Sequence, residues 1–115
     1  MSAVVRNTLI ESAKAKKVED ASVYGDLMIR PMVVGDNEML LEITAPKGTK
    51  VPTHKHNHES VGYIVKGELK MIVDGKEYLA GVGFAFRHPE GVLHSTEALE
   101  DTVYIEIKSP PIKTW

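Results

Sequence analysis

The sequence predicts an all-β protein, either a sandwich or a small barrel of the jelly-roll type. Three observations indicate this fold. Eight or nine short apolar runs follow one another from Asp26 onward, turn residues separate them at close intervals, and the helices that must connect the strands of a parallel sheet are missing. A jelly roll folds two sheets face to face, and its interior is filled by side chains or open to a ligand.

Length and composition favour a single globular domain. The chain has 115 residues, of which 43% are hydrophobic and 26% charged, the balance of an ordinary folded protein. Its formal charge of −2 argues against a nucleic-acid partner. The absence of cysteine excludes a disulfide, a thiolate zinc site and a cysteine nucleophile. Because no run of about 18 apolar residues occurs, we expect a cytoplasmic protein without a membrane partner.

The N-terminal segment is expected to be a short helical or extended element at the periphery. Thr8 and Glu11 have the spacing of a helix capping box, which predicts a short helix continuing through Lys17. The apolar face of this helix is thin, so we expect it to fray or to dock on a partner subunit. The chain then divides into an N-terminal arm (1–25), a β-barrel (26–109) and a C-terminal tail (110–115).

The strands of the barrel are predicted from apolar runs and turn residues. Two runs, 26–34 and 38–45, flank a Gly-Asp-Asn turn and predict a hairpin, in which Pro31 marks an edge or a bulge. Asp74 and Gly75 predict a second hairpin with a type I′ turn. The other runs are 61–65, 69–73, 76–80, 84–87, 92–96 and 103–108.

The histidines form the one cluster with an evident chemistry. All five lie between His54 and His94, and three of them alternate as His54, His56 and His58. In an extended strand every second side chain points to the same face, so neighbouring imidazoles can converge on one metal ion. Neutral imidazole is a common ligand for divalent transition metals. The alternative is a solvated polar strand.

Residues around the histidines follow a two-part pattern. The first part reads Gly48, five residues, His54, one residue and His56, with Gly67 later; the second reads Gly83, five residues, Pro89, one residue, Gly91, two residues and His94. This pattern resembles the two motifs of the cupin superfamily of small double-stranded β-helix (jelly-roll) barrels. The resemblance implies that His54, His56 and His94 bind one divalent metal ion per chain, which would be Fe, Mn, Zn or Ni.

One residue departs from the family pattern. Ser60 stands where cupins usually have a glutamate ligand, and a neutral hydroxyl is a poor ligand. Glu59 would point to the opposite face of the strand unless a bulge shifts the register. His58 shares the face of Ser60 and is the better candidate for a fourth ligand. Otherwise we expect a three-histidine site completed by water or substrate.

Two further residues are given structural interpretations. His88 precedes Pro89 in the second motif, and we expect a partly exposed side chain at a strand end in preference to a pocket acid or base. Tyr104 is expected to be a packing residue within its strand.

The resemblance leaves several functions open. The segment from His54 to Gly67, with Gly62 and Tyr63, is most similar to small single-domain cupins of sugar-acid metabolism, which implies a metal-dependent enzyme acting on a sugar acid or keto acid. Ser60 makes a three-histidine non-haem iron dioxygenase the alternative. A non-catalytic small-molecule-binding barrel is a second alternative, and a barrel that has lost its metal is a third. The resemblance also implies a homodimer.

Overall fold

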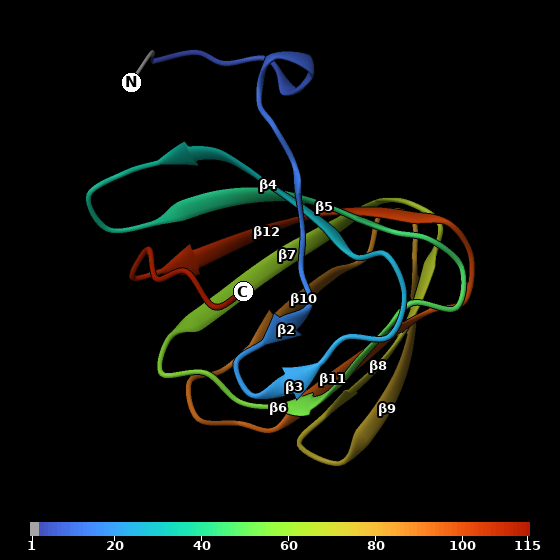
Figure 1. Cartoon of the computed structure of the whole chain (residues 1–115). Helices are drawn as coiled ribbons and strands as arrows, with labels where there is room; N and C mark the ends of the chain where they lie inside the picture. Colours follow the sequence, from blue (N-terminus) through green and yellow to red (C-terminus); the bar gives the residue numbers. More distant parts are fainter. Residues whose placement is uncertain (1–2) are drawn as a thin grey trace.

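Two antiparallel sheets face each other and enclose the interior of a barrel (Figure 1). This computed structural model describes residues 3–115, of which almost all regular structure is β. The prediction of an all-β jelly-roll barrel is confirmed. Within the described residues, no helix is long and apolar enough to cross a membrane.

The two large sheets contain ten of the strands. The six-stranded sheet has, in spatial order, β1 (Ala13–Lys14), β4 (Met28–Val34), β5 (Met39–Ala45), β12 (Thr102–Ser109), β7 (Glu59–Lys66) and β10 (Ala85–His88). The four-stranded sheet has β6 (Lys50–His54), β11 (His94–Ala98), β8 (Glu68–Val73) and β9 (Lys76–Gly81). A small third sheet pairs β2 (Lys17–Val18) with β3 (Ala21–Ser22), and a 3-10 turn, η1 (Asn7–Leu9), precedes them.

Both predicted hairpins are confirmed. Strands β4 and β5 pair antiparallel, and the register shifts between Pro31 and Val33, so the proline lies at a bulge. Strands β8 and β9 pair across Asp74 and Gly75, whose φ angles of 51° and 79° are both positive. A type I′ turn requires this geometry at both central positions.

The helix predicted from Thr8 to Lys17 is wrong. Between Thr8 and Lys17, helical geometry occurs only within η1, whose N-terminus has no side-chain cap. The chain then becomes extended, and Ala13 pairs with Ile29 of β4. Ala15 and Val18 are buried in the core. A short helix with a thin apolar face gains little from packing, whereas the extended segment gains sheet partners and buries these side chains.

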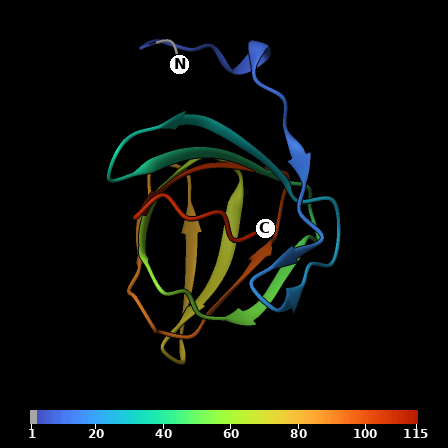
Figure 2. The ribbon, with the colours of Figure 1, turned by 60° about the vertical axis from the view of Figure 1, so that its left-hand side comes forward.

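The apolar core fills the space between the two sheets. Ile29 and Leu41 enter it from the six-stranded sheet, and Leu69 and Met71 enter it from the four-stranded sheet. The segment 110–115 returns across one end of the barrel, while η1 lies away from it (Figure 2). The backbone N–H of Glu19 donates to the carbonyl oxygen of Thr114 at 2.8 Å, which joins the two ends of the chain at this place.

Candidate metal centre

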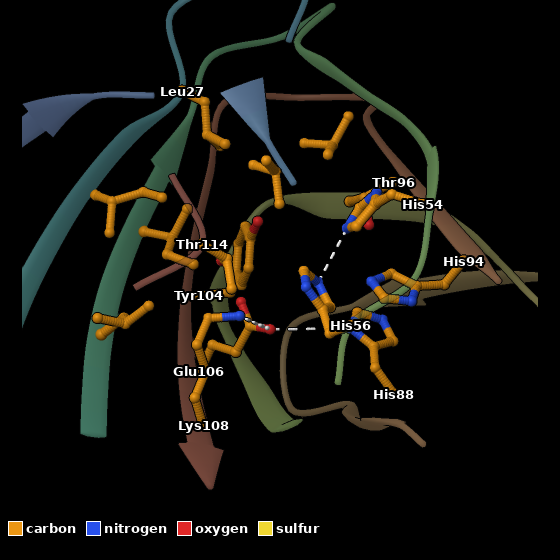
Figure 3. Close-up of a pocket in the computed structure, with 15 residues that line it drawn as sticks. Leu27, His54, His56, His88, His94, Thr96, Tyr104, Glu106, Lys108 and Thr114 are labelled. Carbon is orange, nitrogen blue, oxygen red and sulfur yellow. Dashed lines mark hydrogen bonds and ion pairs between the residues drawn. The ribbon is translucent and has the colours of Figure 1, made fainter. Parts of the chain in front are cut away.

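Three of the predicted ligands converge inside the barrel (Figure 3). His54 ends β6 and His94 begins β11, and these residues are directly paired across the two strands. His56 lies in the connection between β6 and β7. One ring nitrogen of each lies within 4.8 Å of the others, and the Nε2 atoms of His54 and His56 are 3.1 Å apart. The strand predicted to continue to His58 is wrong, because β6 ends at His54.

The hydrogen bonds of the three rings fix their tautomers. Each Nδ1 atom faces an oxygen that can only accept a hydrogen bond, so each Nδ1 carries the proton. The acceptors are the carbonyl of Pro52 for His54 (2.7 Å), the carbonyl of Val92 for His94 (3.2 Å) and the carboxylate of Glu19 for His56 (2.8 Å). A neutral imidazole has one N–H, so every Nε2 presents a lone pair to the interior.

The rings stay neutral at physiological pH. Burial, together with the nearby positive charge of Lys108, lowers the pKa of His56 to about 2. Burial and the neighbouring His88 lower the pKa of His94 to about 3. Burial also lowers the pKa of His54. Their Nε2 lone pairs are therefore available to a cation, since protons do not compete for them near neutral pH.

The donor set fits a divalent metal. Two Nε2 lone pairs 3.1 Å apart cannot hydrogen-bond to each other and repel each other unless a cation lies between them. Imidazole nitrogens bind zinc at roughly 2.0–2.1 Å, so two ligands at octahedral or tetrahedral angles lie roughly 2.8–3.4 Å apart. The separation between His54 and His56 falls in this range. His54, His56 and His94 are the residues that would hold the ion.

The six-stranded sheet lines the same cavity with charged groups. Glu106 and Lys108 of β12 are buried, and the Lys108 Nζ lies 3.5 Å from Glu106 Oε1. Burial alone would raise the pKa of Glu106, but Lys108, and then His88 and Ser60, outweigh it and hold that pKa well below its ordinary value. Glu106 is therefore an ionised carboxylate inside the barrel, balanced by the ammonium group of Lys108.

His88 belongs to this site, and the expectation of a partly exposed side chain is wrong. The residue is buried at the end of β10, and its ring stacks on that of His94 with 3.8 Å between centroids. Its Nδ1 lies 3.9 Å from Glu106 Oε1, and its Nε2 has no hydrogen-bond partner. Strand β10 pairs with β7 through His88 and Ser60, which turns both side chains inward.

The residues considered for a fourth ligand occupy different surroundings. Ser60 is buried and faces His88, with 3.5 Å between Oγ and Nδ1. Glu59 is on the outer face, where its carboxylate binds Arg87 at 3.0 Å. The register of β7 against β12 is regular from Glu59 to Ile64, so no bulge turns this carboxylate inward. His58 is buried, but its Nε2 contacts Lys108 Nζ at 3.2 Å and does not join the three-histidine group.

The sequence interpretation missed Glu106 and Lys108 because β12 buries charged side chains and exposes apolar ones, the reverse of the usual pattern. In β12 the residues Tyr104, Glu106 and Lys108 point inward, and Ile105 and Ile107 point outward. Strand alternation separates these two faces but does not reveal which faces the core. Burial raises the pKa of Tyr104, so its phenol is protonated and packs as expected.

The cavity between the two sheets is small. Its volume is about 40 Å³, and it is lined by His54, His56, His88 and His94 together with Glu106 and Lys108. Thr114 of the C-terminal segment also lines it, and the buried Oγ1 of this residue has no hydrogen-bond partner. The C-terminal segment therefore covers the site.

Comparison with known proteins identifies the family. A family model described as a Cupin domain matches residues 41–107, which is more than half of the chain. The chain belongs to the cupin family. The matched segment contains all three converging histidines and Glu106, and Lys108 follows its last residue. Proteins of this family commonly bind metals and small molecules.

Individual cupins of known sequence or structure cover most of the chain. The pectin degradation protein KdgF of Dickeya dadantii (strain 3937) is 26% identical over 89 residues, which is 75% of this chain and 81% of that protein. The structure of KdgF from Halomonas sp. is 21% identical and covers 93% of this chain and 94% of its own, with a TM-score of 0.80. An RmlC-like cupin from Shewanella frigidimarina NCIMB 400 is 25% identical and covers 98% and 95%, with a TM-score of 0.84.

Proposed function

We propose that the protein is a divalent-metal-dependent enzyme that acts on a small sugar acid or keto acid. One observation carries the proposal. Three Nε2 lone pairs converge in a cavity whose opposite wall holds a buried, ionised Glu106 beside Lys108. Perturbed ionisable groups gathered in one cavity are typical of active sites, because burial and neighbouring charges set their protonation for chemistry.

The charges of the cavity favour an anionic substrate. Lys108 is a buried ammonium group, and a substrate carboxylate would pair with it at low dielectric. The relative from Dickeya dadantii is named for pectin degradation, and pectin is a polymer of a sugar acid. A sugar acid exceeds a volume of about 40 Å³, so its entry requires some of the groups that line the cavity to move aside.

The residues divide the chemistry between them. A divalent metal on the three histidines would supply Lewis-acid polarisation of a substrate oxygen. Glu106 is placed to accept a proton from a substrate carbon or hydroxyl and to return it. His88 lies between Glu106 and His94, so it is positioned to share that proton. Lys108 orients the substrate carboxylate and balances the charge of Glu106.

Two measurements on the purified protein test this proposal. Elemental analysis is expected to give one divalent ion per chain, lost in His94→Ala. Turnover is measured on an unsaturated uronate, whose conjugated alkene absorbs ultraviolet light that disappears on reaction. Metal without turnover on any sugar acid or keto acid contradicts the enzyme, and a protein that binds no ion after refeeding contradicts the metal site.

A three-histidine non-haem iron dioxygenase is the second candidate. The observation that favours it is the neutral Ser60 at the inward position of β7, with Glu59 held outside by Arg87. An iron-loaded protein that consumes oxygen with a substrate, and is inactive with zinc, would support this function. Binding of a small acid without turnover would instead support the non-catalytic barrel.

A homodimer is also part of the proposal. The outer face of the six-stranded sheet exposes Val61, Tyr63 and Ile107 beside Ile105, an apolar surface that a second copy would cover. Analytical ultracentrifugation is expected to give twice the chain mass for the wild type and the single mass for Tyr63→Asp. Tyr24→Asp, at an exposed tyrosine outside this face, is the control that should stay dimeric.

A further inference from the structure

Glu19 lies in the turn between β2 and β3, at the mouth of the barrel. We propose that Glu19 is a positioning residue that holds His56 in the Nδ1–H tautomer, with its Nε2 directed at His54 and His94. The proposal rests on the metal site of the proposed function. Its starting point is the 2.8 Å contact between Glu19 Oε1 and His56 Nδ1, which joins residues 37 positions apart.

His56 needs this support more than its two neighbours do. His54 and His94 lie in strands, and each donates its Nδ1–H to a carbonyl two residues earlier, so their own backbone orients them. His56 lies in the connection between β6 and β7, and the partner that orients its ring is Glu19. A carboxylate that accepts from a ligating histidine fixes the ring and increases its basicity.

The arm that carries Glu19 is anchored from several sides. Tyr24 and Lys50 exchange backbone hydrogen bonds, which attach the segment after β3 to the start of β6. Val18 is buried in the core. The backbone N–H of Glu19 donates to the carbonyl of Thr114. The carboxylate is therefore held at a defined place, and it connects the site to the segment that covers the cavity.

The backbone at Glu19 also points to a function for its side chain. Its φ is +52°, a left-handed conformation that glycine adopts at lower cost than any residue with a Cβ. The neighbouring turn residue, Asp20, does not have a positive φ, and the side-chain carboxylate that bonds to His56 is that of Glu19. The turn therefore favours glycine at the position where the site uses a carboxylate.

A second metal at this place is disfavoured. Oxygen and nitrogen atoms of Glu19, His56 and His58 also lie within 4.8 Å of one another. However, the ammonium group of Lys108 is 3.2 Å from His58 Nε2 and would repel a cation bound there. The contact between Glu19 and His56 is thus best explained as support for the three-histidine group.

Three variants test the positioning of His56. Affinity for Zn²⁺ is measured by competition with a chromophoric chelator, and the tautomer of His56 is measured by nitrogen NMR of the metal-free protein. Glu19→Gly is expected to lose about 10- to 100-fold in zinc affinity and to populate the Nε2–H tautomer. Glu19→Gln should lose less, since its amide oxygen still accepts from Nδ1–H. Asp20→Asn removes the same charge from the same turn and should bind zinc as the wild type does.

Thermal unfolding of the metal-free proteins separates positioning from folding. Glycine favours a positive φ, and this gain opposes the loss of the hydrogen bond to His56, so Glu19→Gly is expected to unfold at a temperature close to that of the wild type. An unchanged zinc affinity and an unchanged tautomer in Glu19→Gly would overturn the proposal. If the wild type binds no zinc or other divalent ion, the proposed metal site is contradicted. Nitrogen NMR of the metal-free protein then still decides whether Glu19 sets the tautomer of His56.

Discussion

The two walls of the cavity carry different chemistry. The four-stranded sheet supplies His54 and His94, which are neutral and are oriented by their own strands. The six-stranded sheet supplies Glu106 and Lys108, which are buried as a charged pair. In the proposed function, metal binding therefore belongs mainly to the four-stranded sheet and proton transfer to the six-stranded sheet. If this division is correct, each function can be removed while the other is kept.

The largest effect is expected from Glu106→Gln. The amide keeps the shape of the side chain but cannot accept a proton, so turnover of the uronate should fall roughly 10²- to 10⁴-fold. Elemental analysis should still give the full metal content, because the three histidines are unchanged. Glu59→Gln, on the outer face of the same sheet, is the matched control and should keep full turnover. Loss of metal from Glu106→Gln would contradict the separation of the two walls.

Lys108→Met is expected to destabilise the fold by about 3–5 kcal/mol. The substitution leaves the carboxylate of Glu106 buried without its positively charged partner, and an unpaired buried charge strongly lowers the free energy of unfolding. Urea unfolding of the metal-free protein measures the change. The double variant Glu106→Gln with Lys108→Met removes both charges and should recover much of the loss. If the double variant is as unstable as Lys108→Met, the pairing of these charges does not explain the effect.

Acidification should destabilise the metal-free protein by a few kcal/mol. The pKa of His56 falls from 6.5 to about 2 on folding and that of His94 to about 3, so below pH 6.5 the unfolded chain binds protons that the folded chain does not. Stability is complete above pH 6.5 and is lost as pH falls from there toward 3, by about 1.4 kcal/mol per histidine at a pH near 5.5.

Urea unfolding of the metal-free protein at a pH near 7.5 and near 5.5 measures this loss. A comparison between about pH 7.5 and 8.5 is the control and should show no change from the histidines. An equal unfolding midpoint at pH 7.5 and 5.5 would show that the histidines are accessible to protons in the folded state.

A smaller effect, about 1–3 kcal/mol, is expected from Gly62→Ala. The missing side chain of Gly62 in β7 leaves space for the ring of Phe86, and a Cβ would collide with that ring. Phe86 in turn lies 5.0 Å from His88, between centroids. The variant should unfold at lower urea concentration while zinc affinity, set by the opposite wall, stays within about twofold. Gly75→Ala is a control for the loss of a glycine, since its Cβ position is open and only the positive φ is strained.

The sequence correctly predicted those features of the fold that depend on residues adjacent in the chain. Asp74 and Gly75 form a turn because of their own φ angles, and Pro31 produces a bulge because it cannot donate to a sheet. The helix predicted after Thr8 failed because its capping signal is local, whereas the segment is stabilised by pairing with β4 and by burial of Val18. A weak local preference yields to packing when the packing partner lies far along the chain.

By itself, the sequence determined the all-β fold and the cupin motifs, through the periodicity of its apolar residues, its turn residues and the spacing of the motifs. That His94 joins His54 and His56 was implied by the resemblance to cupins, and the structure brings the three rings together. Only the tertiary structure decided that Glu106 faces inward and that Glu19 contacts His56. Alternation along a strand is symmetric between its two faces, and a contact between residues 37 positions apart exists only once the chain has folded.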